Sequence, residues 1–133
     1  MADFDLVIRN GTVATAADVF KADVGVMDGR ITALGAALGP GRHEIDAGGK
    51  LVLPGGIDSH CHIAQVSSMG IATADDFLSG SRSAAAGGNT TLIPFAAQHR
   101  GQSLRKVVED YHREAEGKAI IDYAFHLIIS DPR

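Results

Sequence analysis

The 133-residue sequence predicts an α/β protein in which a small all-β region precedes a series of βαβ units. Two observations support this prediction. Up to residue 53, short runs of strand-forming residues alternate with tight-turn signals, and the runs have the length of strands. After Pro54, apolar strand-like runs alternate with helix-like segments, which is typical of parallel strands joined by right-handed crossovers. We therefore expect a β region at 1–53 and an α/β region at 54–133.

The strands expected in the β region are short and separated by glycine-containing turns. FDLVIR is followed by Asn10-Gly11 and TVAT, and DVGVM is followed by Asp28-Gly29 and RITALG. Both dipeptides favour the positive φ angles of two-residue hairpin turns, so we expect a hairpin at each. GAALGPGRHE is typical of a loop, and EIDAGGK and LVLPGG each contain a further short strand.

The first helix expected in the α/β region begins at Thr73 and ends before Gly87-Gly88. Thr73 precedes the segment as a cap, Asp76 lies three residues on as its acidic partner, and paired glycines commonly end a helix. The run TTLIPFAA that follows is typical of a buried strand.

The second expected helix has Ser103 as its cap and ends at Gly117. Its apolar residues recur at helical spacing and would share one face. These residues are Leu104, Val107, Val108, Tyr111 and Ala115. IIDYAFHLII then predicts a third strand, which completes a strand, helix, strand, helix, strand series.

Charge and composition exclude several classes of partner. The formal net charge is −4 and the sequence has no basic run, which argues against nucleic acid or an anionic membrane surface as the main partner. Neither a charged leader nor a membrane-length apolar run is present, so we expect a cytoplasmic protein. The single cysteine, Cys61, fits a reducing compartment, and on a strand its thiol would point away from the flanking histidines. A packed thiol is therefore favoured over a metal ligand.

The motif PGGIDSHCHI places His60 and His62 two residues apart after an apolar run. In an extended chain such residues share one face, about 6.6 Å apart. Both imidazoles can then reach one ion at roughly 2.0–2.1 Å, which favours metal binding over two separate core histidines. Asp58 would share this face, where it could orient an imidazole or cap a turn.

The other histidines are less informative. His43 and His112 are expected on the surface, and His99 in a solvated loop. Alternation along the third strand places Tyr123, Phe125 and Leu127 toward the helices, and His126 toward the opposite face. We expect His126 to be a buried, hydrogen-bonded structural histidine, with a site-lining residue as the alternative.

Three motifs together resemble a known family. PGGIDSHCH, AAAGGNTTLIPF with GQSL after it, and IDYAFH occur in the order found in the cyclic amidohydrolases, most closely the dihydropyrimidinase and hydantoinase family. The resemblance implies a TIM-type (β/α)8 barrel with a small β-sandwich. It also implies two zinc ions bridged by a carboxylated lysine and a hydroxide, with His60 and His62 as ligands and Asp58 as the motif aspartate.

The reaction implied by the resemblance is ring opening of a dihydropyrimidine or a 5-substituted hydantoin by a metal-bound hydroxide. Such hydrolysis needs no serine or cysteine nucleophile. An allantoinase or dihydroorotase type of cyclic amidohydrolase is one alternative, and a non-catalytic dihydropyrimidinase-like assembly protein is another. The resemblance also implies a homotetramer, or at least a dimer.

The family's bridging lysine and remaining catalytic groups lie on later strands than the three expected here. About eight strands close such a barrel, so we predict that these 133 residues are the N-terminal part of a longer enzyme and are inactive alone. Substrate contacts are expected from Gln65, Ser67, Met69 and Phe95. Asn89 interrupts a motif that usually carries glycine and threonine, and the sequence assigns it no role.

Overall fold

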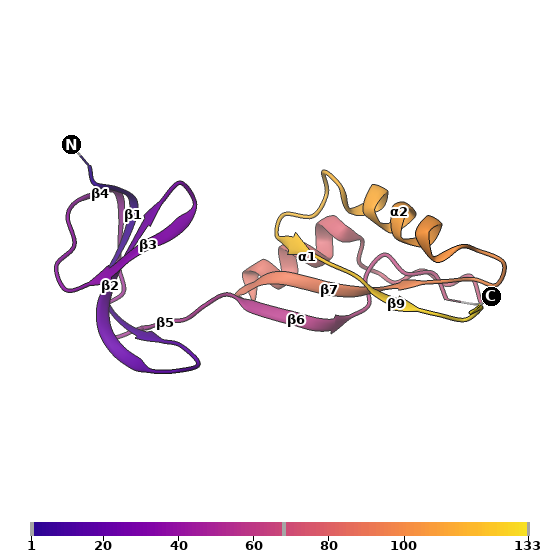
Figure 1. Ribbon diagram of the computed structural model, residues 1–133, viewed down its shortest axis with the longest axis horizontal. Coiled ribbons are helices and arrows are strands. Elements are labelled where there is room, and N and C mark those ends of the chain that lie inside the picture. The colour runs from indigo at the N-terminus through magenta and orange to yellow at the C-terminus, as the bar shows by residue number, and fades with distance from the viewer. Residues whose placement is uncertain (1, 68, 133) are drawn as a thin grey trace. The chain divides into compact units, whose positions relative to one another are not determined.

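The computed structural model describes residues 2–67 and 69–132. The chain divides into two compact units, Met1–Pro54 and Gly55–Arg133 (Figure 1). The first unit contains strands only, and the second contains parallel strands and helices. No helix in the described ranges has the length and apolarity needed to cross a membrane.

The first unit is a five-stranded mixed sheet built around its first strand. Its strands are β1 (Phe4–Ala14), β2 (Val19–Met27), β3 (Arg30–Gly35), β4 (Gly41–Asp46) and β5 (Leu51–Val52). The order is β3-β2-β1-β4, and β5 also pairs with β1. β1 is antiparallel to β2 and parallel to β4 and β5, so the strand nearest the N-terminus holds the unit together.

One of the two predicted hairpins is present. Asp28 and Gly29 have φ angles of 51° and 70°, and Met27 lies opposite Arg30, as in a two-residue hairpin. The prediction at Asn10-Gly11 is wrong, because β1 runs through both residues with a register shift between Ile8 and Gly11. The dipeptide forms a β-bulge there, and the chain reverses later, between residues 15 and 18.

Tertiary partners explain why the turn signal at Asn10 produces a bulge. The Asn10 backbone N–H donates to Asp23 at 3.0 Å, and its side-chain amide donates to Asp46 at 3.0 Å. A Cβ on Gly11 would lie 2.5 Å from Val52 Cγ2, so glycine also permits β5 to approach closely. The positive φ of 60° at Asn10 is therefore stabilised inside the sheet.

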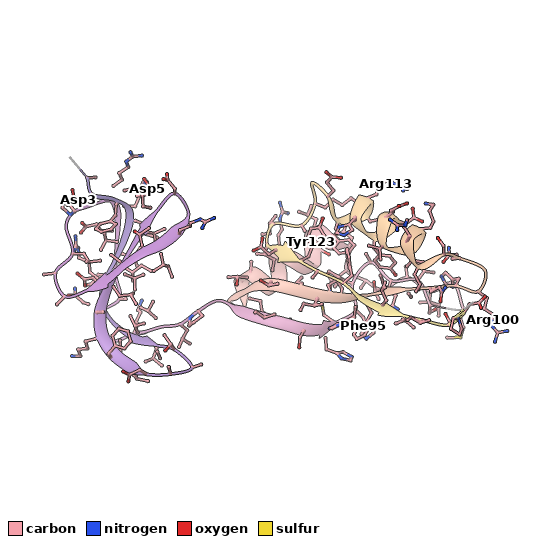
Figure 2. All side chains as sticks on the ribbon, in the orientation of Figure 1. Asp3, Asp5, Phe95, Arg100, Arg113 and Tyr123 are labelled. Carbon is pink, nitrogen blue, oxygen red and sulfur yellow. The ribbon has the colours of Figure 1, made fainter. Side chains whose placement is uncertain are left out.

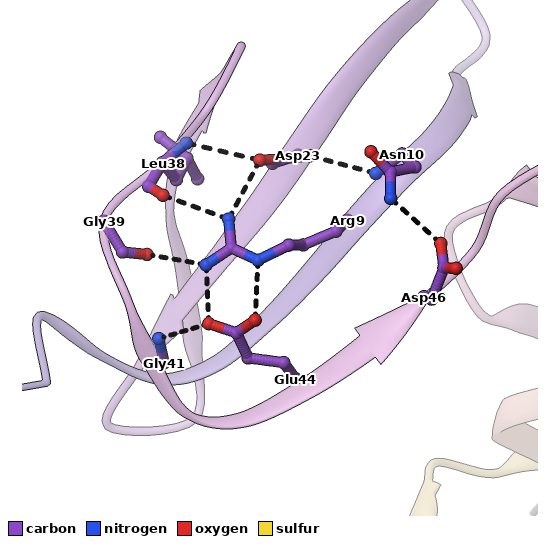
Figure 3. A network of polar contacts seen from close by, with 8 residues as sticks. All are labelled: Arg9, Asn10, Asp23, Leu38, Gly39, Gly41, Glu44 and Asp46. Atoms are coloured by element: carbon purple, nitrogen blue, oxygen red, sulfur yellow. Dashed lines mark hydrogen bonds and ion pairs between the residues drawn. The ribbon is translucent and has the colours of Figure 1, made fainter.

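A charged network fixes the loop between β3 and β4 to the sheet (Figure 3). Arg9 donates to both carboxylate oxygens of Glu44, at 2.7 and 2.5 Å, and to Asp23 at 3.2 Å. It also donates to the carbonyls of Leu38 and Gly39 at 3.0 and 3.2 Å. A guanidinium is suited to this role because its donors form a planar fork.

This network makes the stability of the first unit sensitive to acid. The Arg9 guanidinium lowers the pKa of Glu44 from 4.5 to about 2, chiefly by hydrogen bonding. The Asn10 backbone N–H, followed by other donors, lowers the pKa of Asp23. Folded pKa values below the unfolded ones stabilise the native state above the unfolded pKa, and this contribution is lost as pH falls through the folded pKa.

We therefore expect the first unit to lose stability between pH 4.5 and about 2. Glu44→Gln should lower stability at neutral pH and differ less from the wild type at pH about 2, because protonation then removes the same charge. Urea unfolding followed by circular dichroism over this pH range measures the difference. An equal difference at both pH values would contradict the role given to Glu44.

The second unit is a parallel sheet with its crossover helices on one side (Figure 1). Its elements in chain order are β6 (Gly56–Cys61), α1 (Phe77–Ala86), β7 (Asn89–Ala97), α2 (Leu104–Ala115), β8 (Asp122–Tyr123) and β9 (His126–Ile128). β6, β8 and β9 all pair with β7 in parallel. The predicted parallel βαβ series is confirmed.

The helix boundaries follow their caps. α1 begins at Phe77 and not at Thr73, because Asp76 is itself the N-cap and accepts from the backbone of Leu78 and Ser79 at 2.9 and 2.8 Å. Thr73 N donates to the Gln65 carbonyl at 2.9 Å and so belongs to the preceding loop. The predicted cap of α2 is confirmed, since Ser103 accepts from Lys106 N at 3.2 Å.

The predicted third strand is interrupted. Between β8 and β9, Ala124 N donates to the Leu92 carbonyl at 3.0 Å, and no strand is assigned to residues 124–125. Tyr123 and Phe125 pack against the core formed by Ile63, Phe77, Leu92 and Ala115, as their alternation predicted. Leu127 is 38% exposed, and its predicted place on the helix side stays a prediction.

Phe77 anchors this core, being 1% exposed with ring centroids 6.1 Å from both Tyr123 and Phe125. We expect Phe77→Ala to destabilise the second unit by about 3–5 kcal/mol, because it leaves a cavity, and Phe77→Leu to cost less. Both tyrosines of the sequence, Tyr111 and Tyr123, lie in this unit. Their fluorescence during urea unfolding measures the loss, and an unchanged midpoint in Phe77→Ala would contradict the packing.

Candidate metal centre

The two histidines lie at the carboxyl end of β6. His60 is in the strand, His62 follows its last residue, and both side chains are exposed. Their ring centroids are 5.6 Å apart, with 67° between the ring planes. Two imidazoles that bind one zinc ion at its usual bond length have centres about 5 Å apart. The spacing of the two rings is therefore compatible with a shared ion.

Phe95 of β7 packs against both rings. Its centroid lies 4.6 Å from His60, edge to face at 63°, and 5.0 Å from His62, stacked at 12°. Phe95 lies near the end of β6, on the opposite side of the sheet from the helices, whereas Tyr123 lies on the helix side (Figure 2). Phe95, which was predicted to contact substrate, thus packs directly against both histidine rings.

Gln65, also predicted to contact substrate, contacts His62. Its side-chain oxygen lies 2.6 Å from His62 Nδ1. An amide oxygen can only accept, so Nδ1 carries the proton and Nε2 keeps its lone pair. The spacing of three residues between His62 and Gln65 is the one signal in the sequence that a short loop could bring them together.

Asp58 lies away from the histidine rings. Asp58 pairs with Leu92 and Cys61 with Pro94, so β6 has two residues where β7 has one, and the register shifts. This extra residue reverses the alternation, and Asp58 joins Cys61 and Leu92 around a hollow on the helix side. The expectation that Asp58 shares a face with His60 is wrong, because the sequence does not reveal a bulge of this kind.

The Asp58 carboxylate accepts the backbone N–H of His60 at 3.1 Å. It therefore stabilises the bulged backbone on which His60 lies. This contact agrees with the turn-capping alternative and leaves the imidazoles without a carboxylate partner from Asp58.

Cys61 packs as a thiol. It is half-buried against the core around Phe77 and Leu92. Burial, and then the negative charge of Asp58, raises the pKa of the Cys61 thiol. Because the thiolate is the form that binds metal, both effects favour the packed thiol that the sequence predicted.

His126 connects the third strand to the histidine strand. Its Nε2 lies 3.0 Å from the Ser59 carbonyl, within the bulge of β6, and its ring lies 5.1 Å from that of Phe95. It is hydrogen-bonded as predicted, but the prediction of burial is wrong, because its side chain is exposed. Alternation nevertheless placed His126 on the correct face of the sheet, which is the face that carries Phe95.

Ser67 and Met69 lie in the loop between β6 and α1. Ser67 closes a turn there, with its hydroxyl accepting from Ile71 N at 3.2 Å and its backbone N–H donating to the Ile71 carbonyl at 2.9 Å. Met69 is 79% exposed. Ser67 therefore has a structural partner, and the predicted substrate contacts of both residues remain predictions.

Asn89 has a structural role that the sequence did not indicate. It pairs with Gly56 at the start of β7, and a Cβ on Gly56 would lie 2.4 Å from its side-chain oxygen. The asparagine side chain thus occupies the space that the glycine leaves open.

Further metal ligands are absent from the part of the chain that the structure describes. No group of three or more His, Cys, Asp or Glu residues within 2–67 and 69–132 could hold an ion. Since zinc sites in proteins use at least three protein ligands, the histidine pair by itself does not make a complete zinc site.

Comparisons with known proteins show which enzymes this chain is similar to. The chain is 46% identical over 128 residues to a D-hydantoinase of Ralstonia pickettii, covering 96% of this chain and 28% of that enzyme. It is homologous to the hydantoinases and dihydropyrimidinases. A dihydropyrimidinase of Rattus norvegicus is 42% identical over 94% of this chain and 25% of its own length. This homologue thus spans about a quarter of its relatives' length.

Solved structures agree with this homology. A D-hydantoinase structure superposes on 98% of this chain and 28% of its own with a TM-score of 0.92 and 45% identity. The dihydropyrimidinase from Brevibacillus agri NCHU1002 superposes on 94% of this chain and 27% of its own with a TM-score of 0.88 and 43% identity. Residues 1–54 also match the family model of the urease alpha-subunit N-terminal domain.

The family resemblance and the fold class predicted from the motifs are therefore confirmed. The β unit and the parallel βαβ series both occur within the superposed part of the hydantoinase structure. The second unit is an open sheet over the described residues, so closure of a barrel stays a prediction.

The His126 contact gives a stability test for this hydantoinase homologue. His126→Ala removes the donor to the Ser59 carbonyl, and we expect a loss of about 0.5–1.5 kcal/mol in the second unit. His43→Ala, an exposed change on β4, serves as the control. Tyrosine-detected urea unfolding compares the two variants, and equal midpoints would show that the contact does not stabilise the bulge.

Proposed function

We propose that this chain supplies His60 and His62 to the zinc site of a cyclic amidohydrolase that opens dihydropyrimidine or 5-substituted hydantoin rings. The observation that carries the proposal is the exposed pair of imidazoles, 5.6 Å apart, at the carboxyl end of a parallel strand. The carboxyl ends of such strands carry the chemistry of α/β barrel enzymes. The curated relatives named D-hydantoinase and dihydropyrimidinase give the class of ring.

The residues of this chain hold and orient the ligands in this proposal. His62 presents Nε2 because Nδ1 is hydrogen-bonded to Gln65, and Phe95 limits rotation of both rings. Bound zinc would supply activation of water near neutral pH and polarisation of the ring carbonyl. We assign no proton-transfer residue within the chain, and we propose that a carboxylated lysine and the remaining ligands lie elsewhere in the complete protein.

The alternative functions make different demands on the same site. An allantoinase or dihydroorotase would keep the histidine pair and change the ring, so only substrates distinguish it. A non-catalytic assembly protein would not require the pair, and the presence of both histidines favours the enzyme. A free-standing structural zinc domain would need four ligands, more than the described residues bring together.

Further properties belong to the same proposal. We propose a homotetramer, or at least a dimer, acting on a small cyclic amide in the cytoplasm. The 133 residues alone would be inactive, because the histidine pair lacks its other ligands. The relatives, of which the chain spans about a quarter, support a longer functional protein.

Metal analysis and ring-opening assays of the complete gene product test the proposal. We expect more than one zinc per chain, and a loss of at least about 100-fold in kcat/KM in His60→Ala and in His62→Ala, because each removes a ligand. His43→Ala on β4 is the control and should keep both zinc and activity. Undiminished zinc content and rate in both ligand variants would refute the site.

The choice of substrate follows from the same assay. A 5-substituted hydantoin, dihydrouracil, allantoin and dihydroorotate are compared at equal concentration. Ring opening of either of the first two supports the proposal. Hydrolysis confined to allantoin or dihydroorotate would instead establish the neighbouring activity.

A further inference from the structure

The loop that follows the histidine pair brings the Gln65 side chain back to the His62 ring. Ala64 has a positive φ of 51°, and its N–H donates to the Asp75 carbonyl at 2.8 Å. Gln65 then donates its N–H to the Thr73 hydroxyl at 3.1 Å and accepts at its carbonyl from Thr73 N at 2.9 Å. Both backbone groups of Gln65 are thus fixed, and its side chain starts from a defined position.

The side chain reaches His62 from this position. Its oxygen lies 2.6 Å from Nδ1, and Gln65 itself is only partly exposed. The imidazole is stacked on Phe95 with 12° between the planes. The stack limits rotation of the ring and the hydrogen bond decides which nitrogen carries the proton, so the two contacts determine different properties of the same ligand.

A metal-binding histidine needs such a partner. The nitrogen that binds must be unprotonated, and a hydrogen bond from the other ring N–H selects that tautomer. The sequence suggested Asp58 for this role, but its carboxylate accepts from the His60 backbone and lies on the helix side. The Gln65 side-chain oxygen lies beside His62 Nδ1, where this role requires a hydrogen-bond acceptor.

We infer that Gln65 is a positioning residue that holds His62 as the Nδ1–H tautomer and directs Nε2 outward as a ligand. The metal part of this inference rests on the proposed function, and the tautomer part does not. An amide orients the ring without adding negative charge, whereas a carboxylate at the same position would make a stronger, charge-assisted hydrogen bond. Gln65→Leu and Gln65→Glu should therefore change the site in opposite directions.

The first experiment measures the tautomer in the 133-residue chain without metal. Long-range ¹H–¹⁵N spectra of ¹⁵N-histidine-labelled protein, recorded under alkaline conditions where histidine rings are neutral, identify the protonated nitrogen of each ring. We expect His62 to be protonated on Nδ1 in the wild type and in Gln65→Glu, and to become a mixture in Gln65→Leu. The matched variant Gln102→Leu, in the loop after β7, should leave His62 unchanged.

The second experiment measures zinc affinity in the complete gene product. We expect Gln65→Leu to weaken binding by about 10–100-fold, the usual effect of removing a partner of a ligating histidine. Gln65→Glu should bind zinc at least as tightly as the wild type. Gln102→Leu should have the wild-type affinity.

The two experiments separate the possible failures. His62 protonated on Nε2 in the wild type, or a spectrum that Gln65→Leu does not alter, would overturn the inference whether or not zinc binds. A tautomer that depends on Gln65 in a protein that binds no zinc would overturn the proposed function alone. Loss of zinc in Gln65→Leu with the tautomer unchanged would show that the substitution acts on the loop and not on the ring.

Discussion

The extra residue in β6 decides which side chains reach each face of the second unit. Between Asp58 and Cys61 the strand has two residues where β7 has one. The bulge leaves Cys61 on the helix side, where it packs against the core, and His60 and His62 on the other face. Without it, strict alternation would place Asp58 beside the histidines. The site therefore depends on a local irregularity in strand pairing, as is common beside functional sites.

Contacts from neighbouring elements support the bulge and the rings that follow it. Asp58 accepts the N–H of His60, and His126 of β9 lies in hydrogen-bonding distance of the Ser59 carbonyl. Phe95 of β7 packs against three imidazoles, those of His60, His62 and His126. Parallel strands make this possible because their carboxyl ends meet at one edge of the sheet, so residues distant in sequence gather beside the histidine pair.

The first unit shows the same dominance of tertiary contacts over local signals. Asn10-Gly11 favours a hairpin when considered alone, yet β1 is extended through it because Asp23, Asp46 and β5 satisfy its polar groups and fill the space beside it. At Asp28-Gly29 the Asp28 N–H donates to Asp5 at 2.8 Å, but no atom lies within 4 Å of a Cβ placed on Gly29, and the dipeptide makes the hairpin that its sequence favours. The same dipeptide chemistry thus gave two structures, according to what lay next to it.

Periodicity, turn residues and capping chemistry in the sequence were sufficient for the parallel βαβ series, the hairpin at Asp28-Gly29, the cap of α2 and the position of the histidine pair at the carboxyl end of a strand. These features depend on interactions within a few residues, which a sequence displays directly. Only the tertiary structure decided the face on which Asp58 lies, the stacking of Phe95 on His62 and the contact of Gln65 with His62 Nδ1. They depend on the pairing of β6 with β7 and on the path of a loop held by Thr73, and such long-range register is not encoded in the spacing of any single segment.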